Sequence, residues 1–316
     1  MNPDEGFVEA NSLSADGRSI RLHYLLWRTA SEGHASFPGR AVWPPLILLH
    51  ATGFLARLWQ PVAEKLATRF DVYALDMRGH GDSDKPAPGA RSEEPGVGDG
   101  PYHWRNLVAD LRGFCDGLAL RGVSIVGHSS GGAAAAYLAA THPEYVSRLA
   151  LFEPIILPVD FAPPEDRRND LAEAARKRRM VWSNAGEIVE AYRTRPAFER
   201  WQSDVLRLYA EHGTFRREDG QIELKCPGEV EAAFFDHSRS LDTWDRLPDV
   251  RCPTLLMWGE LSQGPFPALM AQVAERIPNA TIATIPRAGH LAPMERPDAI
   301  AEEILTFMEN AAWPKS

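Results

Sequence analysis

A short run near the middle of the chain has the residue types and spacing of a nucleophilic serine site. Gly127-His128-Ser129-Ser130-Gly131 follows an apolar segment and precedes a stretch of small residues. A Gly-x-Ser-x-Gly sequence between a strand and a helix places the serine in a sharp turn, with its hydroxyl above a sheet. The two glycines are needed because those positions approach their neighbours too closely for a side chain. We therefore predict Ser129 as the nucleophile, with the positive end of a helix directed at the site.

A serine nucleophile needs a base with a pKa near neutrality, and His290 is the candidate. Gly289-His290 lies between the last predicted strand and the C-terminal helix. A purely structural role on this loop is the alternative interpretation. His128 is excluded as the base because its side chain is fixed beside its neighbour on the same turn.

Several motifs together resemble the α/β-hydrolase superfamily, over nearly the whole chain outside a central insertion. They are the serine run, the histidine run Ala288–Pro297, the run Asp76–Ser83, which resembles a structural turn, and His50-Ala51-Thr52-Gly53. The last run follows the third strand, where family members often carry His-Gly-x-x. The resemblance implies an oxyanion hole made by the backbone N–H groups of Thr52 and Ser130. Ala51 departs from the usual glycine of that loop.

The sequence departs from the family pattern at the acidic residue that orients the catalytic histidine. Many members carry an aspartate in Trp-Gly-x-x-Asp after the seventh strand, and this chain has Ser262 at that position, in the run 258–262. A serine cannot stabilise an imidazolium by charge. Glu260, two residues earlier, is one candidate. Glu153, at the end of the sixth strand, is the favoured one, because haloalkane dehalogenases and zearalenone-type lactonases resemble this chain in having a glutamate there.

The elements that must position these residues alternate between strands and helices. Predicted strands cover 20–27, 46–50, 72–75, 123–127, 149–152, 254–258 and 281–285, and predicted helices cover 59–68, 103–120, 131–141, 268–276 and 298–311. The first strand follows a predicted turn at 15–17 and is expected to be half of a hairpin, and 82–100 is predicted to be a long loop. This alternation predicts an α/β fold with a mostly parallel sheet and helices on both faces. The charged segment 155–247 is predicted to be a helical cap inserted after strand 6, between core parts 1–154 and 248–316.

Aromatic residues are candidates for the substrate pocket. Phe54 and His128 lie beside the predicted oxyanion loop and nucleophile, and Trp182, Trp201 and Trp244 belong to the predicted cap. Caps of this kind close over the nucleophile and select the substrate. The alternative is that each tryptophan belongs to the cap's own core.

Composition excludes several other classes of protein. The 316 residues carry a formal charge of −9, with 44% hydrophobic and 24% charged residues. This balance argues against binding to nucleic acids or anionic membranes. Three widely spaced cysteines support neither a disulfide framework nor a zinc site. With no signal-like start and no apolar stretch of 18 residues, we expect a cytoplasmic protein without metal or organic cofactor. Its oligomeric state is left open.

These features predict a serine hydrolase that cleaves a small carboxylic ester or lactone through an acyl-enzyme with a Ser-His-Glu triad. A serine nucleophile disfavours dehalogenase and epoxide hydrolase chemistry, in which a carboxylate attacks carbon. The main alternative is a carbon–carbon bond hydrolase acting on a β-diketone or a ring-cleavage product. A perhydrolase and a ligand receptor with a hydrolase fold are further alternatives.

Overall fold

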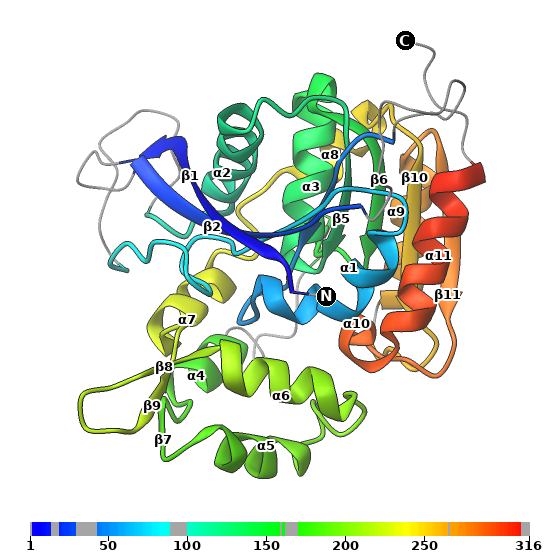
Figure 1. Ribbon diagram of the computed structural model, residues 1–316. Helices are drawn as coiled ribbons and strands as arrows, with labels where there is room; N and C mark the ends of the chain where they lie inside the picture. The colour runs from blue at the N-terminus through cyan, green and yellow to red at the C-terminus, as the bar shows by residue number, and fades with distance from the viewer. Residues whose placement is uncertain are drawn as a thin grey trace.

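The main sheet of the protein has eight strands, in the order β1-β2-β4-β3-β5-β6-β10-β11 (Figure 1). The computed structural model describes residues 2–13, 19–29, 43–88, 100–158, 160–161, 170–264 and 266–310. The strands are β1 (Asp4–Leu13), β2 (Ser19–Trp27), β3 (Leu46–Leu49), β4 (Val72–Leu75), β5 (Val123–His128), β6 (Val146–Phe152), β10 (Thr254–Gly259) and β11 (Ala280–Ile285). The strands from β4 to β11 in this order run parallel, and β1 and β2 are antiparallel to their neighbours.

Both faces of the sheet are covered, which explains why the central strand β3 is apolar at every position. In β3, Ile47 and Leu49 point into one core cluster, and Leu46 and Leu48 point into the other. The first cluster includes residues of α2 (Trp104–Gly117), α3 (Ser130–Thr141) and α9 (Phe266–Arg276). The second includes residues of α1 (Gln60–Leu66) and α11 (Pro297–Asn310). The predicted α/β-hydrolase fold is confirmed.

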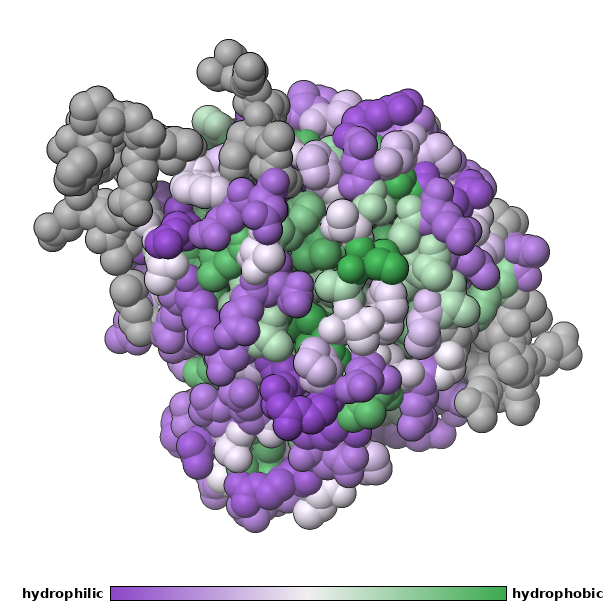
Figure 2. Space-filling model, turned by 90° about the vertical axis from the view of Figure 1, so that its right-hand side faces the viewer, coloured by the Kyte–Doolittle hydropathy of each residue, from purple (hydrophilic) through white to green (hydrophobic). Residues whose placement is uncertain are grey.

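Most of the segment between β6 and β10 forms the lower part of the molecule in Figure 1, whereas its last helix lies higher, beside α3. It contains α4 (Asp170–Arg176), α5 (Ala185–Arg193), α6 (Ser203–His212), α7 (Gly228–Asp236) and α8 (Thr243–Arg246). The face of this segment seen in Figure 2 is mainly hydrophilic, and its aromatic side chains pack in a cluster that also includes Phe54, Leu55 and Met294 of the core. This segment, 155–247, is called the insertion below. That it is a separate cap domain stays a prediction.

The insertion contains short strands beside its helices, and the sequence analysis did not predict these strands. A three-stranded antiparallel sheet, β7-β9-β8, is formed by β7 (Val181–Trp182), β9 (Ile222–Leu224) and β8 (Thr214–Arg216). Strands of two or three residues are too short to show an alternating pattern. A usable signal was present in Asp219-Gly220, a turn dipeptide between two short β-rich runs, where Gly220 has φ +83°.

The predicted hairpin at the N-terminus is present, since β1 pairs with β2 along almost its whole length. Its predicted turn at 15–17 lies outside the described residues, as do residues 89–99 of the predicted loop 82–100. No helix among the described residues is long and apolar enough to cross a membrane. Cys115, Cys226 and Cys252 are free thiols.

Candidate active site

Ser129 stands in a strained turn between β5 and α3. Its backbone angles are φ +55° and ψ −116°, a region that residues with a side chain rarely occupy. A Cβ on Gly127 would lie 2.6 Å from the Gly132 backbone, and one on Gly131 would lie 2.7 Å from the His50 carbonyl oxygen. The backbone at both positions therefore approaches its neighbours as closely as the sequence motif predicts, and only glycine permits the Ser129 turn there.

Glu153 and His290 form a short hydrogen bond beside this turn. The His290 Nδ1 lies 2.6 Å from the Glu153 Oε2, and the Glu153 side chain is fully buried. Strands β5 and β6 are paired up to His128 and Phe152, so Ser129 and Glu153 are the next residues on neighbouring strands. With a carboxylate as acceptor, Nδ1 carries the proton and Nε2 is left with a lone pair, the form required of a general base.

The Glu153 carboxylate is held by two further donors from the end of β10. Its Oε1 accepts a hydrogen bond from the Gly259 N–H, at 2.9 Å, and another from the Ser262 hydroxyl. Strand β10 lies directly beside β6. Ser262, at the position of the family's usual aspartate, is therefore a hydrogen-bond donor to a carboxylate that is carried by the neighbouring strand.

Glu260, the alternative acid, is placed elsewhere. Its side chain belongs to an exposed residue, and its Oε2 accepts a hydrogen bond from the Arg287 N–H at 2.8 Å. The structure thus brings Glu153, and not Glu260, to the imidazole of His290. The geometry favours Glu153 as the acid.

His128 supports the loop that carries His290. Its Nε2 donates to the backbone carbonyl oxygen of His290 at 2.8 Å, and the two rings lie 5.0 Å apart. Burial and the neighbouring His290 lower the pKa of His128 well below its usual value, which keeps the ring neutral. A pocket candidate in the sequence analysis, His128 has the geometry of a positioning residue.

The insertion also contacts the histidine loop. Glu295 accepts a hydrogen bond from the Gly289 N–H at 2.8 Å, and its carboxylate pairs with Arg200 of the insertion at 3.3 Å. The Gln202 N–H donates to the Met294 carbonyl oxygen at 3.0 Å. The sequence analysis did not single out Glu295, although this carboxylate lies within the quoted histidine run.

The two predicted oxyanion donors lie side by side. The Thr52 hydroxyl donates to the Ser130 hydroxyl at 3.0 Å, and both residues are buried. Within the described part of the chain, neither backbone N–H has a hydrogen-bond acceptor. Two neighbouring, unoccupied N–H groups beside a nucleophile are what the stabilisation of an oxyanion requires.

The loop Ala51–Phe54, called the oxyanion loop below, is held by the turn after β4. The Gly53 N–H donates to His80 Nε2 at 2.9 Å, and the Met77 N–H donates to His50 Nε2 at 3.0 Å. Burial lowers the pKa values of His50 and His80, so both rings stay neutral and can accept these bonds. The turn that the sequence analysis interpreted as structural therefore acts on the site through this loop.

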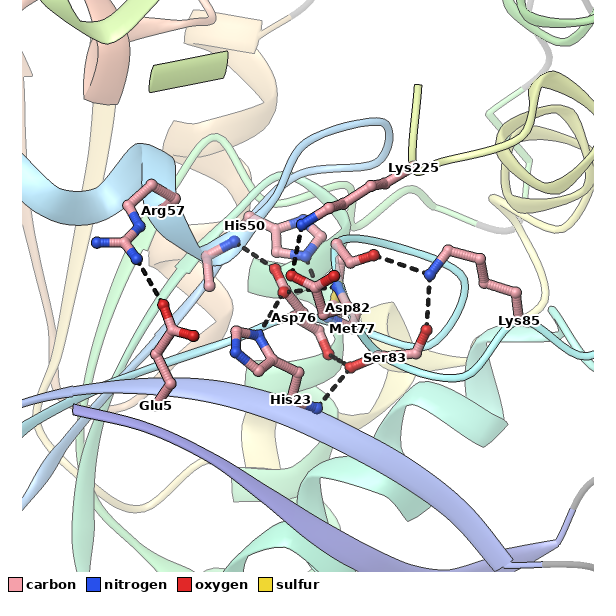
Figure 3. A network of polar contacts seen from close by, with 12 residues as sticks. Glu5, His23, His50, Arg57, Asp76, Met77, Asp82, Ser83, Lys85 and Lys225 are labelled. Carbon is pink, nitrogen blue, oxygen red and sulfur yellow. Dashed lines mark hydrogen bonds and ion pairs between the residues drawn. The ribbon is translucent and has the colours of Figure 1, made fainter. Parts of the chain in front are cut away.

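Asp76 is the centre of the polar network below this loop (Figure 3). Its carboxylate accepts hydrogen bonds from the His23 ring, at 2.7 Å, and from the N–H groups of Ala56 and Asp82. His23, Asp76 and Asp82 are close enough together to hold a metal ion. However, Asp76 is occupied by N–H donors, and Asp82 pairs with Lys225 at 2.6 Å. This donor set fits a structural network and not a metal site.

The predicted pocket residues fall into two groups. Phe54, Trp182 and Trp201 share one aromatic cluster, in which the Phe54 and Trp201 rings lie 5.4 Å apart. Trp182 is packed inside the insertion, 1% exposed, which favours a role in its core. Trp244 lies away from this cluster and lines a cavity of about 270 Å³ with Arg105, residues 155–158 and residues 238–243.

Comparisons with known proteins agree with the fold. The family model described as "Alpha/beta hydrolase family" matches residues 46–303. A 2-(acetamidomethylene)succinate hydrolase of Mesorhizobium japonicum is 27% identical, covering 84% of this chain and 88% of its own. An N-formylmaleamate deformylase of Pseudomonas putida is 28% identical, covering 96% and 98%. The crystal structure of an E-2-(acetamidomethylene)succinate hydrolase has a TM-score of 0.74 at 22% identity, covering 97% and 99%.

The extent of the family match decides the class of the protein. It covers most of the chain, from β3 into α11, and includes the serine turn, the end of β6 and the histidine loop. The chain belongs to the alpha/beta hydrolase family.

Proposed function

We propose that this hydrolase cleaves a carboxylic ester or lactone by acyl transfer to Ser129. The observation that carries the proposal is the 2.6 Å hydrogen bond between His290 and Glu153 on the strand next to the serine turn. It fixes the imidazole in the tautomer that accepts a proton. The free N–H groups of Thr52 and Ser130 supply the complementary electrostatic element.

Each residue then has one task. His290 takes the proton of the Ser129 hydroxyl as that oxygen attacks the carbonyl carbon, and the Thr52 and Ser130 N–H groups stabilise the oxyanion. His290 returns the proton to the leaving alcohol, which leaves an acyl-enzyme. Water, activated by the same imidazole, releases the acid and regenerates the serine. Glu153 stabilises the imidazolium in both halves of the reaction.

Cleavage of a carbon–carbon bond is the second candidate, because the same triad serves both reactions. Neither of the two relatives described above is named as an esterase, since one is a 2-(acetamidomethylene)succinate hydrolase and the other an N-formylmaleamate deformylase. Their names therefore favour a second candidate beside ester hydrolysis. In this alternative, a β-diketone or a ring-cleavage product takes the place of the ester.

The test is a panel of p-nitrophenyl esters of increasing chain length, several lactones and a β-diketone. We expect turnover of at least one ester or lactone and its loss in Ser129→Ala, with Ser183→Ala, an exposed serine of the insertion, as the matched control. Turnover of the diketone without turnover of esters or lactones would favour the second candidate. Equal activity of Ser129→Ala and the wild type would refute the nucleophile.

A further inference from the structure

An ion pair of the insertion lies directly against the oxyanion loop. The Arg178 Nη1 and the Glu231 Oε2 are 2.6 Å apart, and the two side chains are only 14% and 12% exposed. The Glu231 Oε1 occupies the space that a Cβ on Gly53 would fill. Gly53 follows Thr52, so a carboxylate of the chain itself lies one residue away from a proposed oxyanion donor.

Three buried hydrogen-bond donors around this pair lack an acceptor among the described residues. They are the Arg178 Nε, the Tyr192 hydroxyl and the Trp201 Nε1. Trp182, in the same aromatic cluster, does have an acceptor, the Arg179 carbonyl oxygen at 3.2 Å. Buried donors without acceptors are rare in folded proteins and need a ligand or water to satisfy them.

The three donors belong to one neighbourhood. The Tyr192 and Tyr209 rings stack 5.7 Å apart, and the Trp201 ring lies 6.2 Å from Tyr209 and 5.4 Å from Phe54 of the oxyanion loop. Arg178 interacts electrostatically with both tyrosines and with Glu231. The Arg178–Glu231 pair lies against Gly53, and the rings of Trp201 and Tyr209 lie 5.4 and 6.3 Å from Phe54, so the guanidinium and the aromatic cluster meet the same oxyanion loop.

A carboxylate is the acceptor that matches these donors. A single carbonyl oxygen has two lone pairs, whereas a carboxylate offers about four acceptor sites. A guanidinium binds carboxylates with strong, charge-assisted hydrogen bonds. The position of Glu231, paired with Arg178, already shows that a carboxylate is accommodated beside the oxyanion loop.

We propose that Arg178, Tyr192 and Trp201 bind a carboxylate of the substrate, and that Glu231 is the partner of Arg178 in the free enzyme. The inference rests on the proposed hydrolase function and narrows its substrates to esters or lactones whose acyl part carries a carboxylate near the scissile carbonyl. Burial raises the pKa of Glu231 while Arg178 opposes this rise. A substrate that takes over Arg178 therefore favours the protonated, uncharged form of Glu231.

The test compares two esters that differ only in charge. Mono-p-nitrophenyl succinate ends in a carboxylate, and p-nitrophenyl 4-methylpentanoate ends in an isosteric, neutral isopropyl group. We expect the wild type to prefer the succinate ester by at least about 10-fold in kcat/KM. Arg178→Gln should lower kcat/KM for this ester by about 100-fold and abolish the preference over the neutral ester, since it removes one partner of a buried charged hydrogen bond. Tyr192→Phe should raise KM for the succinate ester alone.

Glu231→Gln separates this role from a structural ion pair. Because the variant removes a competing anion, it should lower KM for the succinate ester, in the direction opposite to Arg178→Gln. The double variant Arg178→Gln/Glu231→Gln has no unpaired charge, so it should fold well and still lack the preference. Arg193→Met, an exposed arginine of the insertion with 55% side-chain exposure, is the matched control. Calorimetric titration of Ser129→Ala with succinate gives a readout that is independent of turnover.

The outcomes distinguish the two proposals. No preference for the succinate ester in a wild type that does hydrolyse the neutral ester would overturn the carboxylate site alone. The site would also be refuted if the Arg178 and Glu231 variants changed both esters in parallel. Failure to hydrolyse either ester, together with measurable binding of succinate that depends on Arg178, would overturn ester hydrolysis and leave the site standing.

Discussion

The carboxylate of Glu153 is fixed from three sides, by His290, by the Gly259 N–H and by the Ser262 hydroxyl. One oxygen faces the imidazole, and the other accepts both donors from the end of β10. An anion that is buried and fully hydrogen-bonded can stabilise a transient imidazolium without reorganising during the reaction. The serine at position 262 is consistent with an acid that has moved from β10 to β6.

The first prediction concerns the identity of this acid. Glu153→Gln keeps the size of the side chain but removes the charge that stabilises the imidazolium, so kcat should fall by about 10³- to 10⁴-fold, the loss typical of a triad carboxylate. Steady-state kinetics with a p-nitrophenyl ester measure it. Glu260→Gln, which removes only a contact with the Arg287 N–H, should retain wild-type turnover. The opposite pattern would show that Glu260 is the acid.

At this scale the sequence predicted individual residues best where a motif restricts the backbone. The turn of Ser129 follows from two glycines, and the structure shows the steric reason for both. The choice between Glu153 and Glu260 stayed open because it depends on strand order, which places β6 beside both β5 and β10. Unsatisfied donors such as the Tyr192 hydroxyl belong to side-chain packing, which residue types alone do not fix.

Among the elements, the turn after β4 acts on the site indirectly, through hydrogen bonds to the segment that carries the oxyanion loop. It supplies the acceptor for the Gly53 N–H, through His80, and Asp76 accepts from the Ala56 N–H at the other end of the same segment. The oxyanion loop is therefore fixed at two points by an element that contributes no reacting group.

The second prediction tests this support. His80→Leu removes the acceptor of the Gly53 N–H, so the adjacent Thr52 N–H should lose its orientation and kcat should fall by roughly 10- to 100-fold with little change in KM. His80→Gln supplies an amide oxygen as an alternative acceptor and should recover part of the loss. The split between kcat and KM, measured on one ester, is the readout. An equal decrease in both variants would mean that the hydrogen bond is not what matters.

Elements of the core were more predictable than those of the insertion. A strand such as β3 is buried on both faces, so an unbroken apolar run identifies it. The strands of the insertion have two or three residues and depend on contacts with one another, as the pairing of β9 with both β7 and β8 shows. Local sequence therefore carried little information about them.

At the scale of the whole molecule, buried histidines link stability to pH. In the described part of the chain, burial lowers the pKa values of His50, His80 and His128, so that their rings stay neutral. They lie in the loop after β3, in the turn after β4 and at the end of β5. In the unfolded chain each would titrate near pH 6.5. Below that pH the unfolded state binds more protons than the native state, so the free energy of unfolding must decrease as the pH falls.

The third prediction is a loss of stability that begins near pH 6.5, before ordinary carboxylates protonate. Each neutral histidine contributes up to about 1.4 kcal/mol per pH unit, so the three together reach a slope of roughly 4 kcal/mol per pH unit. Urea unfolding between pH 7.5 and 5 measures it. His80→Gln should reduce the slope by about one third. An unaltered slope in His80→Gln would contradict the assignment.

The residues proposed to carry out the reaction all lie outside residues 155–247. They are Ser129, His290, Glu153, Thr52 and Ser130. The residues proposed to recognise the substrate carboxylate lie inside that range. On these two proposals, reaction and recognition lie in separate stretches of the chain. An exchange of residues 155–247 that keeps the contacts of Arg200 and Gln202 with the histidine loop should therefore change the substrate and keep the reaction.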